Sequence, residues 1–198
     1  MKCVVYIHGF NSSSASFKAG VLEKELGAIG LAMKFFCPDL HHVPSKAIKV
    51  IHETIADYRT QDVVLVGSSL GGFYASYLTS VFGYQSILIN PAIQPHVGLS
   101  DYLGTQKNLY SGVEYEFTDQ HLRELEGMYI TDFDHIEKAF LIHTTGDELL
   151  DWKIAMRRYE GAKRLIVQGS DHGFSNFADY VEVVSDYITR NFLLHGHN

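Results

Sequence analysis

Short hydrophobic runs recur along the chain and are separated by longer segments with a helical pattern. The runs lie at Cys3–Ile7, Leu31–Cys37, Val63–Val66, Ser86–Ile89, Ala139–His143 and Leu165–Val167. Most of them are rich in Val, Ile or Phe, as strands buried on both faces of a parallel sheet are. The pattern therefore predicts a sheet of about six strands.

The segments between these runs carry hydrophobic residues at helical spacing. One such stripe consists of Ile48, Ile51, His52 and Ile55, with Ser45 as the expected N-cap. Helices are expected at Ser16–Ile29, Ser45–Tyr58, Gly72–Phe82, Trp152–Tyr159 and Asn176–Phe192. Because strands and helices alternate, we expect an α/β fold in which a mostly parallel sheet carries helices on both faces.

One stretch, residues 91–136, breaks this alternation. It contains no strand-like run, although connections in compact domains are usually about 4–6 residues long. Thr118 and Asp119 predict the start of a short helix over Gln120–Glu126. Since open α/β sheets bind ligands at the C-terminal edge of the strands, we expect a lid-like insertion over that edge. No repeat or linker divides residues 1–198, so we expect a single domain.

The composition is that of an ordinary globular protein, with 46% hydrophobic and 20% charged residues. The formal net charge of −7 argues against nucleic-acid binding as the main role. No segment reaches the roughly 18 apolar residues of a membrane span, and the hydrophobic run after Lys2 is too short for a signal peptide. We therefore expect a cytoplasmic protein. Cys3 and Cys37 are expected to be buried thiols, because two cysteines make no disulfide framework.

The sharpest chemical motif is Gly67-Ser-Ser-Leu-Gly71, a Gly-x-Ser-x-Gly sequence centred on Ser69. It stands between an expected strand and an expected helix, which is the setting that a nucleophile elbow needs. Glycines on either side of the serine let the strand and the helix approach closely. The Ser69 hydroxyl is then expected at the helix N-terminus, where the dipole favours developing negative charge. The alternative is an ordinary turn with a capping serine.

A serine hydroxyl needs a base to become a nucleophile, and the base needs an orienting acid. His172 lies between the last expected strand and the last expected helix, so we expect this base at the same sheet edge as Ser69. Asp147 follows Gly146 in the loop after the preceding strand, near that strand's end, and is the expected acid. Asp151 stands where a helix N-cap is expected and is the alternative acid. Lesser candidates are Glu148 and Asp171.

The developing oxyanion needs preorganised hydrogen-bond donors. One is expected to be the backbone N–H of Leu70, the residue after the nucleophile. The second is expected from the loop after the first strand, where Gly9 allows close approach and Phe10 supplies the N–H. We interpret His8, in the same loop, as a structural hydrogen-bonding residue.

Several further motifs accompany the elbow from one end of the chain to the other. They are His8-Gly-Phe-Asn-Ser-Ser13, Val66-Gly-Ser-Ser-Leu-Gly-Gly-Phe-Tyr-Ala75, Ile89-Asn-Pro-Ala92, Asp101-Tyr-Leu-Gly104, Thr145-Gly-Asp-Glu-Leu-Leu-Asp151 and Asp171-His-Gly-Phe174. Together they resemble the small YqiA/YcfP-type esterases of the α/β-hydrolase superfamily. The resemblance implies a minimal α/β-hydrolase fold and a serine esterase that needs no cofactor, with Ser69, Asp147 and His172 as its triad.

The leading hypothesis is a serine hydrolase that cleaves carboxylic esters or acyl thioesters of small molecules through an acyl-serine intermediate. An acyltransferase that uses the same intermediate is the near alternative, and a non-catalytic binding module is the alternative from another class. A metal site is not expected, because the adjacent His41 and His42 should point apart and no third ligand is evident. The natural substrate, the acyl length and the oligomeric state stay open.

Overall fold

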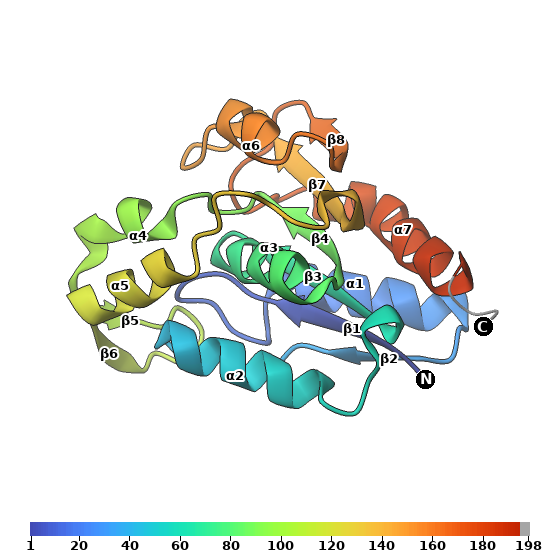
Figure 1. Ribbon diagram of the computed structural model, residues 1–198, viewed down its shortest axis with the longest axis horizontal. Coiled ribbons are helices and arrows are strands. Elements are labelled where there is room, and N and C mark those ends of the chain that lie inside the picture. Colours follow the sequence, from blue (N-terminus) through green and yellow to red (C-terminus); the bar gives the residue numbers. More distant parts are fainter. Residues whose placement is uncertain (195–198) are drawn as a thin grey trace.

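The structure, a computed structural model, describes residues 1–194, so the last four residues of the predicted domain lie outside it. Its centre is a six-stranded sheet in the order β2-β1-β3-β4-β7-β8, in which every neighbouring pair is parallel (Figure 1). The strands are β1 Lys2–Ile7, β2 Met33–Phe36, β3 Val63–Ser68, β4 Gln85–Ile89, β7 Ala139–Thr144 and β8 Lys163–Val167. The predicted parallel α/β fold is confirmed.

Helices cover both faces of this sheet (Figure 1). The helices are α1 Phe17–Ile29, α2 Pro44–Ile55, α3 Leu70–Phe82, α4 Pro95–Gly98, α5 Asp119–Gly127, α6 Trp152–Arg158 and α7 Val181–Leu194. Single turns of 3₁₀-helix lie at η1 Thr60–Asp62, η2 Ser100–Tyr102, η3 Ile136–Lys138 and η4 Phe177–Tyr180. Side chains alternate between the faces of a strand, so Val5 belongs to the hydrophobic core shared with α2, α3, α5 and α6, whereas Val4 belongs to the core shared with α1 and α7.

One local prediction about a helix is wrong in detail. The N-cap of α2 is Val43, not Ser45, and Pro44 is the first helical residue. Proline suits that position because its φ angle is already helical and the amide hydrogen it lacks would have no partner there. Phe17 of α1 is 55% exposed, and the buried side chains of that helix are Ala19, Leu22 and Leu26.

The insertion differs from its prediction in one respect, because residues 91–136 do contain strands. β5 (Gly104–Lys107) and β6 (Glu114–Phe117) form an antiparallel hairpin. Most of their residues are polar, and only Phe117 is buried, so no hydrophobic run marks them. Thr118 is the N-cap of α5, as predicted, and forms a capping box with the His121 ring. The hairpin lies over the loop after β1, where Leu109 N–H donates to the Asn11 carbonyl at 2.9 Å.

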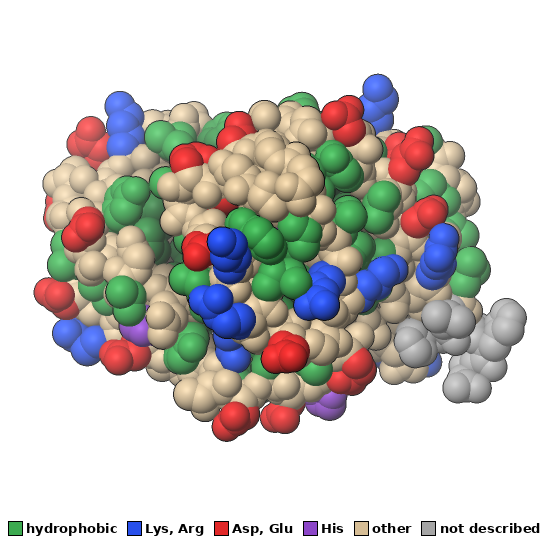
Figure 2. All heavy atoms as spheres, turned by 90° about the horizontal axis from the view of Figure 1, so that it is seen from above, with side chains coloured by type: hydrophobic (Ala, Val, Ile, Leu, Met, Phe, Trp, Pro, Cys, Tyr) green, Lys and Arg blue, Asp and Glu red, His purple; other side chains and the backbone are tan. Residues whose placement is uncertain are grey.

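The two cysteines differ in burial. Cys3 is fully buried in β1, whereas Cys37, just after β2, is only half-buried. On the side of α6 and β8, acidic and basic side chains are interspersed with hydrophobic ones (Figure 2). Among residues 1–194, no helix is long and apolar enough to cross a membrane.

Candidate active site

Ser69 occupies the sharp turn between β3 and α3. Its φ of 56° and ψ of −119° lie in a region that non-glycine residues rarely adopt. The turn is held by the neighbouring strand, because Ser69 N–H donates to the Ile89 carbonyl at 3.0 Å. Gly71 lies so close to the backbone of Ile7 that any Cβ there would overlap the Ile7 carbonyl oxygen. These contacts hold the hydroxyl of Ser69 at the N-terminus of α3.

Three predicted residues, far apart in the sequence, are joined by hydrogen bonds. His172 Nε2 lies 2.9 Å from Ser69 Oγ, and His172 Nδ1 lies 2.8 Å from Asp147 Oδ2. The Asp147 side chain is fully buried, while that of His172 is 17% exposed. The series hydroxyl–imidazole–carboxylate has the connectivity that transfers a proton away from a serine nucleophile.

The carboxylate of Asp147 is oriented by its own loop. Its Oδ1 accepts hydrogen bonds from the amides of Leu149 at 2.9 Å and Leu150 at 2.8 Å, which leaves Oδ2 for His172. Burial alone would raise the pKa of Asp147, but the hydrogen bond and charge of His172, with those amides, hold it below its ordinary value. Asp147 is therefore a carboxylate at neutral pH.

Asp151, the alternative acid, lies elsewhere. It is the N-cap of α6, where its Oδ1 accepts a hydrogen bond from the Lys153 amide at 2.9 Å. This is the arrangement expected of a capping aspartate. The geometry thus brings Asp147, and not Asp151, into contact with His172.

Asn90 is a residue of this site that the sequence reasoning missed. It is fully buried just after β4, with a φ of 41°. Its Nδ2 donates to the carbonyl oxygens of His172 at 3.0 Å and Asp171 at 3.2 Å, and its Oδ1 accepts from the Thr144 amide at 2.9 Å. Asn90 therefore ties the ends of β4 and β7 to the loop that carries His172. The Asn-Pro pair directly after a buried strand is the sequence feature that could have pointed to Asn90.

Two further side chains hold the His172 loop. Glu148, a lesser candidate for the acid in the sequence, accepts a hydrogen bond from the His172 amide on its Oε2 at 2.9 Å. Lys18 of α1 donates from Nζ to the Gly173 carbonyl at 2.6 Å. Burial lowers the pKa of Lys18 to about 8. No sequence pattern links Lys18 to residue 173, because the contact spans 155 positions.

The loop after β1 lies against Ser69. A Cβ placed on Gly9 would lie 3.3 Å from the Cβ of Ser69 and 3.8 Å from its Oγ. Phe10 follows Gly9, and Leu70 follows Ser69 at the start of α3. His8 is buried, and its Nε2 accepts the Leu40 amide at 3.1 Å while Nδ1 donates to the Gly9 carbonyl at 3.0 Å. His8 therefore holds this loop against the segment that follows β2.

His41 and His42 do not point apart as predicted. Their ring centroids lie 4.3 Å apart, and the ring of His42 also stacks on Tyr115 of β6 at 4.4 Å. The hairpin folds over the loop after β2 and so brings both rings to one side. Within residues 1–194, no group of three or more His, Cys, Asp or Glu side chains is arranged to hold a metal ion.

Solved structures with the same fold come from several sources. Est1E from Butyrivibrio proteoclasticus, in a structure with ferulic acid bound, has a TM-score of 0.72 at 16% identity, covering 100% of this chain and 90% of its own. Mouse alpha/beta hydrolase domain-containing protein 10 has a TM-score of 0.73 at 17% identity, with coverages of 95% and 90%. The thioesterase domain from the curacin biosynthetic pathway has a TM-score of 0.59 at 17% identity, with coverages of 95% and 91%.

These similarities, together with the parallel sheet and the serine turn, identify the fold as that of the α/β-hydrolases. At such low identity they establish the fold alone. The family comparison is more specific, because residues 3–189 match one family over nearly the whole length of the chain. The chain belongs to the family described as "Uncharacterised protein family (UPF0227)".

Proposed function

We propose that this protein is a serine hydrolase that cleaves carboxylic esters or acyl thioesters of small molecules through an acyl-serine intermediate. The single observation that carries the proposal is the pair of hydrogen bonds from Ser69 Oγ to His172 Nε2, at 2.9 Å, and from His172 Nδ1 to Asp147 Oδ2, at 2.8 Å. The strained backbone of Ser69 adds support, because such strain persists where the surrounding structure holds it and is common at active sites.

In the proposed reaction, His172 Nε2 accepts the proton of Ser69 as Oγ attacks the acyl carbon. The amides of Phe10 and Leu70 donate to the oxyanion of the tetrahedral intermediate. His172 then returns the proton to the leaving alcohol or thiol, and the bond from the acyl carbon to that group breaks. Water repeats the sequence on the acyl-serine and releases the acid. Asp147 fixes the ring orientation of His172 and stabilises its charged form.

Two other functions would use parts of the same site. An acyltransferase would pass the acyl group from Ser69 to an alcohol or amine in place of water. A binding module would need neither the hydrogen-bonded series nor the strained serine, so these features favour an enzyme. Within this proposal, residues 91–136 form a lid-like part of one domain, and neither a metal nor a cofactor takes part.

The test is labelling by a fluorophosphonate probe combined with product analysis. The wild-type protein is expected to be labelled on Ser69 and to release free acid from a short-chain aryl ester. Ser69→Ala should abolish labelling and lower kcat by several orders of magnitude without unfolding the protein. Ser68→Ala, one residue away at the end of β3, is the matched control and should be labelled as the wild type is. A folded Ser69→Ala protein with most of its activity would refute the mechanism.

A further inference from the structure

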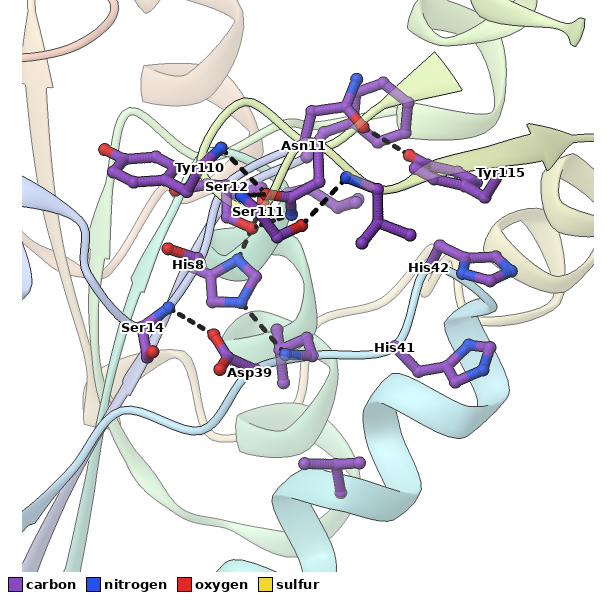
Figure 3. Close-up of a pocket in the computed structure, with 18 of the residues that line it drawn as sticks. His8, Asn11, Ser12, Ser14, Asp39, His41, His42, Tyr110, Ser111 and Tyr115 are labelled. Carbon is purple, nitrogen blue, oxygen red and sulfur yellow. Dashed lines mark hydrogen bonds between the residues drawn. The ribbon is translucent and has the colours of Figure 1, made fainter. Parts of the chain in front are cut away.

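A cavity of about 670 Å³ lies between the β1 loop and the N-terminus of α3 (Figure 3). Gly9 belongs to its wall and also lies against Ser69, and Leu70, the residue after Ser69, is part of the same wall, so the cavity is adjacent to the turn that carries the reacting hydroxyl. The remaining wall comes from the segment after β2, from α2, from α3 and from the hairpin region of the insertion. A volume of this size suits a ligand group with a ring, since small-molecule pockets measure roughly 300–1,000 Å³.

The position of the cavity indicates which substituent of a bound ester can enter it. In the tetrahedral intermediate the leaving oxygen must face His172, which returns the proton, and the oxyanion must face the amides of Phe10 and Leu70. Phe10 and Leu70 line the cavity, whereas His172 is not among the described residues that line it. The remaining substituent, the acyl group, is therefore the part directed into the cavity.

Aromatic rings dominate the cavity wall. His42 stacks on Tyr115 with centroids 4.4 Å apart and an angle of 20° between the planes, and Figure 3 shows the two side chains at the same end of the cavity. Besides His8, six lining residues carry rings, and four are aliphatic. The rings belong to Phe10, His41, His42, Tyr74, Tyr110 and Tyr115; the aliphatic residues are Leu40, Val50, Leu70 and Val113. Because aromatic pairs gain contact energy beyond the area that they bury, this wall favours a ligand that carries a ring.

Polar groups are placed among these rings. Tyr115 donates from Oη to Asn11 Oδ1 at 2.5 Å, and Asn108 and the serines of the β1 loop lie on the same wall. The His42 ring belongs to the same wall, and its nitrogens can bind a hydroxyl group. These groups suit a ligand that carries hydroxyl substituents.

The charge of the wall opposes an anionic ligand. No Lys or Arg belongs to the described lining, and its one acidic side chain is that of Asp39. Burial lowers the pKa of both His41 and His42, which leaves the rings uncharged at neutral pH. A carboxylate or phosphate on the acyl group would therefore meet no positive partner here.

We propose that this cavity binds the acyl part of the substrate and selects acyl groups that carry an uncharged, hydroxylated aromatic ring over straight alkyl chains and over anionic groups. The inference rests on the proposed function, because it assumes an acyl group on Ser69. It deepens that function by naming the class of acid that the enzyme releases.

The first experiment compares kcat/KM for methyl esters of five acids, so that the leaving group stays constant. The acids are acetic, octanoic, phenylpropanoic and hydroxyphenylpropanoic acid, and succinic acid as its monoester. The hydroxyphenylpropanoyl ester is expected to exceed the octanoyl and succinyl esters at least tenfold and the unsubstituted phenylpropanoyl ester by several-fold. An octanoyl or succinyl ester that is cleaved as fast as the hydroxylated ring ester would overturn the inference.

The second experiment locates the preference in the cavity. His42→Ala removes the stacked ring, and Val113→Trp, at a position 63% exposed on the hairpin, fills the space. Each should lower the ratio of kcat/KM for the hydroxyphenylpropanoyl ester to that for the acetyl ester by about tenfold. The matched control is Val183→Trp on α7, also exposed and outside the cavity, which should leave the ratio unchanged.

The outcomes separate this inference from the proposed function. A ring preference that survives both cavity variants would overturn the inference, as would labelling of Ser69 without turnover of the ring esters. Absence of turnover for all five esters together with absence of fluorophosphonate labelling would instead refute the proposed function.

Discussion

The side-chain amide of Asn90 lies 3.0 Å from the carbonyl oxygen of His172 and donates a hydrogen bond to it. Asn90 lies in the loop after β4 and His172 in the loop after β8, 82 positions away in the sequence. The base of the proposed triad is therefore held from behind by the core of the sheet, while its ring reaches Ser69 and Asp147. A positioned imidazole depends on such contacts, because small displacements of a catalytic group cost large factors in rate.

Asn90→Asp tests this contact with an isosteric change. The new oxygen would face the carbonyl oxygens of His172 and Asp171 in place of a donor, and the partner groups would lose their hydrogen bonds in a buried site. We expect a loss of about 2–4 kcal/mol in the free energy of unfolding and a lower kcat. Thermal melting and initial rates check both effects. Wild-type stability and rate in Asn90→Asp would contradict this role.

The two candidate acids should differ in the kind of loss that their removal causes. Asp147→Asn keeps the size of the side chain but not its charge beside His172, so kcat should fall by about 10³–10⁴ with the fold retained. Asp151→Ala removes the N-cap of α6 and should cost about 1 kcal/mol of stability while the rate stays within about tenfold. Loss of turnover in Asp151→Ala but not in Asp147→Asn would reverse the assignment.

The stability of the protein in acid should depend on Asp62. Its buried carboxylate pairs with Arg59 and Lys2 at 2.8 Å and 2.9 Å, and these partners lower its pKa to about 2. The pKa of Asp62 in the folded state is below its value of about 3.9 in the unfolded state. The ionised Asp62 therefore contributes fully to the free energy of unfolding above about pH 3.9, and this contribution is lost as the pH falls towards 2.

Asp62→Asn should therefore be less stable than the wild type at pH 7, by about 1–2 kcal/mol once solvent screening of Arg59 is allowed for. The difference should shrink as the pH falls from about 4 to about 2. Chemical denaturation across this range measures it. Asp186→Asn, in an exposed pair with Arg190, is the control that should change little. An equal difference between Asp62→Asn and the wild type at every pH would exclude this linkage.

Replacing a helical glycine by alanine should change the stability of the protein in opposite directions at two positions. A Cβ on Gly71 would overlap the Ile7 carbonyl oxygen, so Gly71→Ala should cost more than about 3 kcal/mol or prevent folding. A Cβ on Gly27 of α1 meets nothing within 4 Å, so Gly27→Ala should stabilise the protein by about 0.5–1 kcal/mol. Urea titrations compare the two. A tolerated Gly71→Ala would mean that the turn at Ser69 can move.

Much of the architecture can be read from the chain, because it depends on local patterns. The buried strands are hydrophobic on both faces, and the period changes to that of a helix between them, which is sufficient for a parallel α/β prediction. The turn at Ser69 is also local, since its glycines are needed within a few residues of the serine. The hairpin of residues 104–117 was missed because most residues of its strands are polar.

The sequence was enough to predict Ser69, Asp147 and His172 as a triad, because they follow in this order along the chain and each comes after a different strand. The sequence determined this much because parallel strands bring their carboxyl ends to one edge. Only the tertiary structure decided that Asp147 and not Asp151 contacts His172, that Asn90 holds the His172 loop, and that the His42 ring meets Tyr115. Those contacts join segments that are distant in the sequence, and each depends on how a loop packs against the sheet, which no local pattern of residues encodes.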